Sequence, residues 1–456
     1  MKNLKTLFLL TIVILTSFCC IKYTQEGKIK YINIDRTLSL LNSSTKENPN
    51  NVEILFYGQS IIGGMKTSIL VDSLKTRFPF ANISFKHKPI GGFTIPDLTN
   101  TVIHDVYQEN PDLIIFHAYS GIKDGLYDSF IKDLRKRIPS DILLLDHHYV
   151  WNTPNDKLES INKSHDFDSK AIKAIAKKYG CGFVNVRELW KTHLDNNNIA
   201  PNELMGNTVD PNVHPNDRGN MLLRQIVLSK FIKTDSITYD IRRDSLREII
   251  QLNTIKKSIE VEYSGTFIEL VSDNKSQKNK THIAITIDDK KPSELRGSYH
   301  IERPSKGFKS WMPAISKITL GETFPIEEEW TITIFEIDRV NKTFKFKLEG
   351  EKTGLDGEGT NSGKFISTSN RICIDGSNFN IFRIEKILKN ETPENFKIKF
   401  EVNQIVKDTI KVEPNKEKYT LFRSDCDITS HKLKINVIEG KPKFKHLMIS
   451  RPYIIE

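Results

Sequence analysis

The stretch VEILFYGQSIIGG, residues 52–64, decides the fold of the first half of this chain. Residues 52–57 form a short apolar run of strand length, and the apolar residues from Ile61 onward recur at the spacing of a helix face. A strand that passes directly into a helix is the building unit of a parallel sheet covered by helices. Ser60 stands at the junction, so we expect it at the carboxyl edge of the sheet.

The same alternation of short apolar runs and helical periodicity continues downstream. The predicted strands are residues 52–57, 83–88, 113–118, 142–148 and 182–186. They predict a three-layer α/β domain over residues 52–235, with a five-stranded parallel sheet between two layers of helices.

The pattern changes beyond this domain. A charged, helix-like connector over residues 236–255 leads to runs of period two over residues 256–456, separated by turn residues at fairly even spacing. This second half is expected to be an all-β sandwich domain. Residues 21–51, which include the polar stretch NSSTKENPNN, are expected to be a linker ahead of the α/β domain.

Composition agrees with a folded protein of two domains. Of 456 residues, 38% are hydrophobic and 27% are charged, which excludes a disordered chain or a fibre. The net charge of +10 comes from basic residues scattered among acidic ones, as on a solvated surface, although weak attraction to acidic glycans fits it too. No nucleic-acid motif accompanies the charge, so no nucleic-acid partner is expected.

Residues 1–20 have the form of an export signal: a basic start, the apolar run LFLLTIVIL and the pair Cys19-Cys20. The pair resembles a lipoprotein processing site, which makes Cys20 the candidate lipidation site and the membrane a partner through a lipid anchor. Ordinary signal cleavage nearby is the alternative. Either predicts an exported protein of the cell envelope, periplasmic or anchored at a membrane or cell surface.

The remaining cysteines, Cys181, Cys373 and Cys426, are few for a disulfide scaffold. The second and third share the β half and could pair in an oxidising compartment. All three could equally be buried small hydrophobic residues.

Two distant residues carry candidate chemistry. Ser60 at a strand-to-helix turn exposes its hydroxyl and its N–H at the sheet edge, where a nucleophile and half of an oxyanion site can be built. His214 lies in a loop just before the last predicted helix, so it should reach the same edge and accept the serine proton. Taken singly, they are also a plain helix N-cap and a loop histidine.

These blocks resemble the SGNH/GDSL hydrolase family over residues 52–232. GQS stands in place of the usual GDS, GGFT at residues 91–94 resembles the second block, and VHPNDRGN at residues 213–220 resembles the last. The resemblance implies a flavodoxin-like domain, Ser60 as nucleophile, His214 as general base, and the N–H groups of Ser60 and Gly92 as oxyanion donors.

Two positions depart from the family pattern. Gly121 stands where the third block places an asparagine oxyanion donor, unless Tyr119 or Ser120 substitutes. Pro211 stands where the family places its acid, and Asp210, one residue earlier, is the candidate third member of the triad. Loss of one oxyanion donor typically costs about 10²- to 10³-fold in rate.

Other residues at the same edge are candidates for the substrate pocket. They are Gln59, Tyr119, His148 and Trp151, the last two within the run DHHYVW. A metal site in this run is disfavoured because adjacent strand residues point to opposite faces, so no metal and no other cofactor is expected. In the β half, Trp311 is either a glycan contact or a core residue.

The residues and the resemblance together predict an exported serine esterase that removes O-acyl groups, acetyl above all, from a polysaccharide or oligosaccharide. The β half resembles sandwich modules beside bacterial carbohydrate esterases, which supports a carbohydrate context by analogy alone. A catalytically weak glycan-binding lipoprotein with this fold is the alternative, and a lipid esterase ranks below it. The sequence leaves the glycan, the acyl group and the oligomeric state open.

Overall fold

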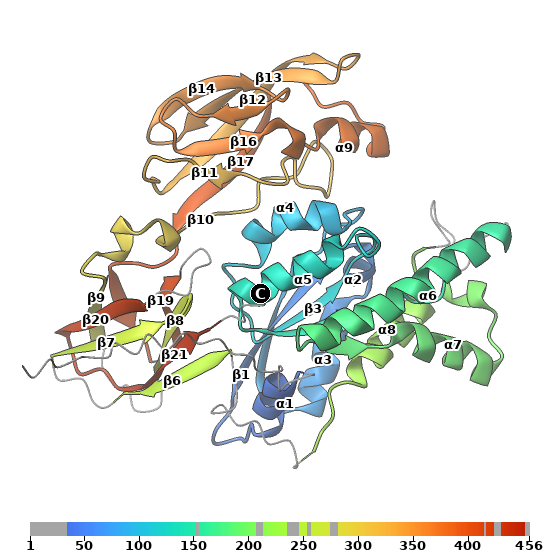
Figure 1. Ribbon diagram of the computed structural model, residues 1–456, viewed down its shortest axis with the longest axis horizontal. Coiled ribbons are helices and arrows are strands. Elements are labelled where there is room, and N and C mark those ends of the chain that lie inside the picture. The colour runs from blue at the N-terminus through green and yellow to red at the C-terminus, as the bar shows by residue number, and fades with distance from the viewer. Residues whose placement is uncertain are drawn as a thin grey trace, which may run out of the picture.

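A computed structural model of the chain describes residues 34–150, 155–206, 213–234, 246–252, 257–273, 281–414, 416–423 and 430–451. Within these ranges the chain forms an α/β domain and two antiparallel β units, which lie on different sides of it (Figure 1).

The α/β domain is built on one parallel sheet, as predicted. Its strands are β1 (Asn51–Gly58), β2 (Asn82–His87), β3 (Leu113–His117), β4 (Asp141–Leu145) and β5 (Gly182–Val184). They lie in the order β2-β1-β3-β4-β5, and every neighbouring pair is parallel. The predicted fold class is therefore confirmed for this half of the chain.

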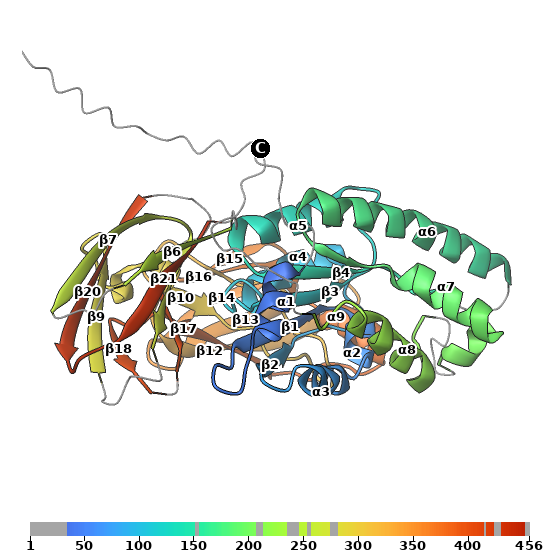
Figure 2. The same ribbon diagram turned by 90° about the horizontal axis from the view of Figure 1, so that it is seen from below.

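Helices cover both faces of the sheet (Figure 2). One layer comprises α1 (Asp35–Asn42), α2 (Ser60–Gly64), α3 (Thr67–Arg77), α7 (Val186–Asn197) and α8 (Asp217–Leu228), the last two joined through the 3₁₀ turn η1 (Pro201–Leu204). The other comprises α4 (Ile95–Asp105), α5 (Leu126–Arg137) and α6 (Asn155–Lys178). In β1, Ile54 packs into the first layer and Leu55 into the second, because alternate strand residues point to opposite faces.

Helix α1 corrects the expected linker over residues 21–51. Leu38 of this helix is buried in the sheet core, and the Arg36 guanidinium lies 2.7 Å from the Asp112 carboxylate. The sequence did not indicate this packing, because the apolar face spans only two turns of helix and a short polar stretch follows it. Residues 21–33 lie outside the described residues.

The second half is all β, as predicted, but its antiparallel sheets form two units where one domain was expected. The inserted unit holds the sheet β10 (Tyr299–Ile301), β17 (Phe396–Gln404), β12 (Glu328–Asp338), β13 (Thr343–Gly350) and β14 (Gly354–Thr360), the sheet β11 (Thr319–Leu320), β16 (Ile372–Asp375) and β15 (Lys364–Ile366), the turn η5 (Gly376–Asn378) and helix α9 (Ile381–Leu388). The flanking unit holds the sheet β18 (Thr409–Val412), β9 (Thr281–Ile287), β20 (Ser430–Glu439) and β7 (Ser258–Ser264), and the sheet β19 (Lys418–Arg423), β8 (Phe267–Ser272), β21 (Phe444–Ser450) and β6 (Arg247–Gln251). Turns η3 (Pro292–Glu294) and η4 (Arg296–Ser298) join the two units.

Each β unit has its own hydrophobic core. The chain leaves the flanking unit after β9, builds the inserted unit and returns at β18. Strand β6 lies inside the connector that was expected to be helix-like, and it pairs with β21. A period of two identifies a strand but does not say which strand it pairs with, so the division into two cores was not visible.

The inserted unit packs over helix α4 of the α/β domain (Figure 1). Its Met312 belongs to the core between α4, α5 and the sheet, and its Arg303 lies 2.7 Å from the buried Asp105 carboxylate. The two ring nitrogens of His104 in α4 bond the Ile301 carbonyl and the Ile318 N–H of this unit. Among the described residues, no helix is long and apolar enough to cross a membrane.

Candidate active site at the carboxyl edge of the sheet

The turn after β1 places Ser60 at the sheet edge. Gly58 has φ 134°, and a Cβ there would stand 2.0 Å from the His117 carbonyl oxygen, so only glycine lets the two strands approach. The Gln59 N–H donates to that same carbonyl at 3.2 Å. Ser60 then begins α2 with its side chain only partly buried.

The loop before α8 brings His214 to this serine. The His214 carbonyl accepts from the Gly206 N–H at 2.8 Å, and Asn216 N–H donates to the Leu204 carbonyl at 3.0 Å. With the loop held in this way, His214 Nε2 lies 2.8 Å from Ser60 Oγ. The two residues that the sequence singled out, 154 positions apart, are thus within hydrogen-bonding distance.

A line of buried side chains runs from the nucleophile to a carboxylate. Ser60 Oγ lies 2.6 Å from Gln59 Oε1, and Gln59 Nε2 lies 2.9 Å from His117 Nδ1. His117 Nε2 lies 3.0 Å from His147 Nδ1, and His147 Nε2 lies 3.6 Å from Asp168 Oδ2. The Gln59 amide nitrogen can only donate, so His117 donates in turn from Nε2 to His147 Nδ1, and the His147 proton lies on Nε2. His147 Nε2 has no hydrogen-bond partner among the described residues, and at 3.6 Å it faces Asp168 without bonding it; these residues are called the Gln59–Asp168 line.

The histidines of this line are neutral. Burial lowers the pKa of His117 and of His147 well below 6.5, and neighbouring histidines lower each further. A neutral imidazole has one donor and one acceptor, which is what each position in the line requires. Burial also lowers the pKa of the neighbouring His165 to about 4.

The line determines how Gln59 meets the nucleophile. Because the Gln59 amide N–H₂ is bound to His117, the amide oxygen must face Ser60. The single Ser60 hydroxyl proton therefore has two acceptors, Gln59 Oε1 and His214 Nε2. General-base catalysis uses the second arrangement.

His148, an expected pocket residue, is buried and holds the loop before α8 instead. Its Nε2 lies 3.0 Å from the Val213 carbonyl, next to His214, and its ring packs against Trp190 at 5.2 Å. Burial lowers the His148 pKa well below 6.5, so the neutral ring donates its Nε2–H to that carbonyl.

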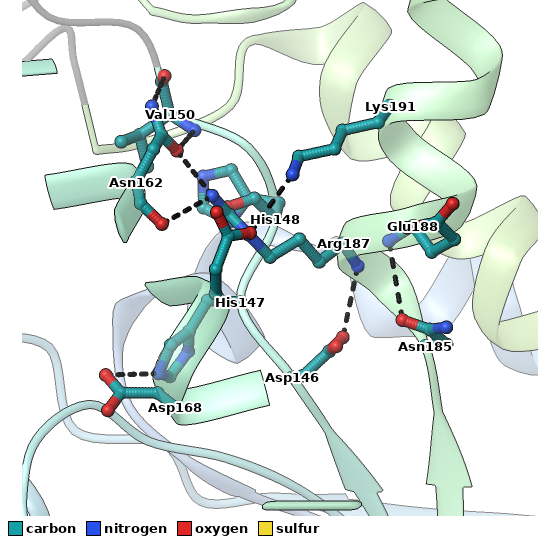
Figure 3. Close-up of polar contacts among 11 residues, drawn as sticks. Asp146, His147, His148, Val150, Asn162, Asp168, Asn185, Arg187, Glu188 and Lys191 are labelled. Atoms are coloured by element: carbon teal, nitrogen blue, oxygen red, sulfur yellow. Dashed lines mark hydrogen bonds and ion pairs between the residues drawn. The ribbon is translucent and has the colours of Figure 1, made fainter. Parts of the chain in front are cut away.

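Arg187 ties the strand end that carries His148 to helix α6 (Figure 3). Its guanidinium donates to the His148 carbonyl at 3.1 Å, to the Asn162 side-chain oxygen at 2.9 Å and to the Asp166 carboxylate at 2.5 Å. Its backbone N–H donates to Asp146 Oδ1 at 3.1 Å, and burial raises the pKa of Asp146 to about 6. These contacts hold the backbone of His148 in place, and the His148 side chain in turn bonds the Val213 carbonyl in the loop before α8.

The expected oxyanion donors stand close to the nucleophile. The N–H groups of Ser60 and Gly92 have no acceptor among the described residues. A Cβ built on Gly91 would stand 3.8 Å from Ser60 Cβ, so the glycine pair flanks the serine. Gly92 has φ 79°, a conformation that favours glycine, and Met312 fills the space where its side chain would go.

The backbone at Gly121 leaves no room for the asparagine that the family's third block places there. Gly121 has φ 80°, and a Cβ there would stand 2.9 Å from the Ile95 side chain. An asparagine does not fit without rearrangement. Tyr119 lies beside it with its ring 5.0 Å from the His117 ring, and Ser120 is exposed.

Some predicted residues fall outside the described part of the chain: Asp210, Trp151, Cys20 and Cys426. The acid of the triad, the lipidation site and the disulfide with Cys373 therefore stay predictions. Within the described ranges, no three histidine, cysteine or acidic side chains are placed to hold a metal ion.

Some residues that build this site carry no signal in the sequence. Asp168 and Arg187 lie in helices without any motif, and Arg383 comes from the inserted unit. Trp311 was a candidate glycan contact, but its place beside this site was not predicted. The pattern DHHYVW marked the right strand end, but it did not show that His147 belongs to the Gln59–Asp168 line or that His148 supports a loop.

No protein-family model matches the chain, and no curated protein matches it. Among solved structures, it is similar to Axe2, an acetylxylan esterase from Geobacillus stearothermophilus, at 20% identity and a TM-score of 0.34, over 42% of this chain and 96% of that one. It is also similar to LAE5, an alpha/beta hydrolase enzyme from the metagenome of Lake Arreo, Spain, at 16% identity and a TM-score of 0.34, over 41% and 98%.

Proposed function

We propose that this protein is an exported serine esterase that removes O-acyl groups, acetyl above all, from a polysaccharide or oligosaccharide. One observation carries the proposal: Ser60 Oγ lies 2.8 Å from His214 Nε2 at the edge of a parallel sheet, beside two N–H groups without an acceptor among the described residues. A hydroxyl, a base and oxyanion donors in one place are the requirements for acyl transfer.

The proposed reaction has two halves. His214 takes the Ser60 hydroxyl proton while Ser60 Oγ attacks the acyl carbonyl, and the N–H groups of Ser60 and Gly92 hold the oxyanion. His214 then gives its proton to the leaving sugar oxygen, so that the ester C–O bond breaks and an acyl-serine remains. Water, deprotonated by His214, attacks this second ester and releases the acid and Ser60.

Two features set the expected efficiency. Asp210 is proposed to orient His214 through Nδ1, as the acid of a triad does. Gly121 supplies no side-chain donor, and a lost oxyanion donor costs about 10²- to 10³-fold in rate. We therefore expect esterase activity that is slow but measurable.

The cellular setting is proposed from the first residues. An export signal over residues 1–20 and lipidation of Cys20 place the enzyme in the cell envelope, with the membrane as a partner through the anchor.

The test uses a chromogenic acetate ester and an O-acetylated xylo-oligosaccharide, with release of chromophore and of acetate as readouts. Ser60→Ala and His214→Ala should each lose at least about 10³-fold in kcat, since the two act as a unit. Ser73→Ala is the matched control, because this hydroxyl only donates to Ile69 of its own helix. Equal rates for wild type and Ser60→Ala would remove the proposal.

The rival function is a glycan-binding lipoprotein with little or no activity. The backbone at Gly121, which excludes an asparagine donor, favours it. Calorimetry would then show oligosaccharide binding by a wild-type protein that releases no acetate. A lipid esterase ranks lower, and it would instead prefer long-chain to acetyl esters.

A further inference from the structure

One large aromatic side chain of the inserted unit lies beside the nucleophile. Trp311 is 48% exposed, although the other tryptophans of the described residues, Trp190 and Trp330, are buried. Its indole N–H donates to the Gly91 carbonyl at 2.9 Å. An exposed tryptophan that is nevertheless held in place suits a binding surface better than a core.

Gly91 links the indole to the reacting atoms. A Cβ on Gly91 would stand 3.1 Å from Trp311 Nε1 and 3.8 Å from Ser60 Cβ. The indole and the Ser60 side chain therefore lie close to the same point beside Gly91. A group bound on the indole is then within one sugar ring of an ester held at Ser60.

The loop that carries Trp311 is held at both ends. Lys306 and Pro313 form a β-bridge, and Gly307 N–H donates to the Met312 carbonyl at 3.0 Å. Met312 is itself buried in the α/β core. Because the indole is already ordered, a ligand that stacks on it loses little affinity to side-chain ordering.

A second contact from the inserted unit holds residues 91–94, which carry the proposed oxyanion donor Gly92 and are called the oxyanion loop. Arg383 donates to the Gly92 carbonyl at 2.7 Å and to the Asp97 carboxylate at 2.6 Å, and its guanidinium lies over the Phe93 ring at 5.0 Å. The indole, the glycine pair and the start of α4 thus form one connected structure.

The surroundings of the indole indicate what it binds. Between Ile301 and Ile318 it is the only exposed large apolar side chain, and its neighbours Ser310 and Lys309 are polar. A sugar ring presents a C–H face to an aromatic and hydroxyl groups to the polar rim, whereas a long acyl chain needs a continuous apolar surface.

We propose that Trp311 is a sugar-stacking residue of a composite active site, and that the inserted unit thereby selects glycan esters over small esters. The proposal rests on the proposed esterase function. It assigns the sugar part of the substrate to the indole face, and the acyl group to the space between Ser60 and Gly92.

The experiment compares Trp311→Ala and Trp311→Phe with wild type on two substrates. For an O-acetylated xylotetraose, Trp311→Ala should raise KM about tenfold or more, and Trp311→Phe, which keeps an aromatic face, should recover most of the loss. For a small chromogenic acetate, which is too short to cover the indole, the KM of Trp311→Ala should rise far less. Phe80→Ala is the matched control, because Phe80 is 49% exposed and precedes β2, at the opposite edge of the sheet.

A catalysis-free measurement separates this proposal from the proposed function. Calorimetry measures the Kd of unacetylated xylotetraose for two proteins, Ser60→Ala and the double variant that also carries Trp311→Ala. The proposal requires a Kd about tenfold higher for the double variant. An equal Kd for both proteins would overturn the stacking role. So would an equal rise in the KM of Trp311→Ala for both esters. Full activity in Ser60→Ala would instead overturn the esterase function alone.

Discussion

The side-chain nitrogen of Gln59 lies 2.9 Å from Nδ1 of His117, and this contact turns the amide oxygen of Gln59 toward the nucleophile. The other end of the amide lies 2.6 Å from Ser60 Oγ. The neutral His117 ring accepts from Gln59 at Nδ1 and donates from Nε2 to His147 Nδ1, which lies 3.0 Å away. A glutamine at this position is therefore part of the support of the nucleophile.

Replacing Gln59 by leucine should affect both stability and rate. Gln59 is buried, and its loss leaves His117 Nδ1 without a donor, which should lower the free energy of unfolding by about 1–3 kcal/mol. Loss of the 2.6 Å contact also removes one of the two groups that position Ser60 Oγ, so kcat should fall by about tenfold. Urea unfolding and steady-state hydrolysis measure the two effects. A variant with wild-type stability would contradict the Gln59–Asp168 line.

Replacing Arg187 by methionine should loosen the support of His148. The buried guanidinium holds the His148 carbonyl and Asn162, so its loss should cost about 2–4 kcal/mol of unfolding free energy. Lys191→Met is the control, because this half-exposed amine contacts the same Asp166 carboxylate at 3.0 Å and should contribute less than about 1 kcal/mol. Similar losses in the two variants would show that Arg187 acts only through Asp166.

Replacing Arg383 by glutamine should lower kcat by about tenfold on small and large esters alike. The side chain holds the Gly92 carbonyl and Asp97, so its loss lets a proposed oxyanion donor move. Lys399→Gln, which breaks an exposed 2.7 Å pair with Glu329 in the same unit, is the control. An unchanged kcat in Arg383→Gln would mean that the oxyanion loop holds its shape without this contact.

Acid should weaken the contact between α4 and the inserted unit through His104. Its Nδ1–H donates to the Ile301 carbonyl at 2.7 Å and its Nε2 accepts from the Ile318 N–H at 3.1 Å, so both nitrogens are used in the neutral ring. Burial lowers the folded-state pKa from 6.5 to about 4. The unfolded chain then binds more protons between these two values, and the stabilisation present above pH 6.5 is lost as the pH falls toward 4.

The expected loss from His104 alone is about 3 kcal/mol, from the shift of its pKa. It is measured as the difference in unfolding free energy between wild type and His104→Gln, whose amide does not titrate. That difference should be large at pH 7.5 and should narrow by pH 4.5, whereas the other buried histidines contribute equally to both proteins. A difference that stays constant with pH would contradict the assignment.

Much of the fold followed from local pattern. The apolar runs at residues 52–57, 113–118 and 142–148 predicted β1, β3 and β4, because a strand buried on both faces needs such a run. The pattern was weaker for helices: the spacing of apolar residues from Ile61 onward predicts one continuous helix, but Lys66 at φ 54° divides the segment into α2 and α3.

What the sequence by itself determined was that Ser60 and His214 reach one edge of the sheet. Residues that follow the carboxyl ends of parallel strands meet there whatever the distance between them along the chain, so a strand-to-helix turn and a loop before the last helix sufficed. The tertiary structure alone decided that Gln59 faces Ser60 with its oxygen, that the β half forms two cores, and that Trp311 and Arg383 stand at the site. These depend on contacts between segments tens to hundreds of residues apart, and such contacts leave no periodic trace in either segment.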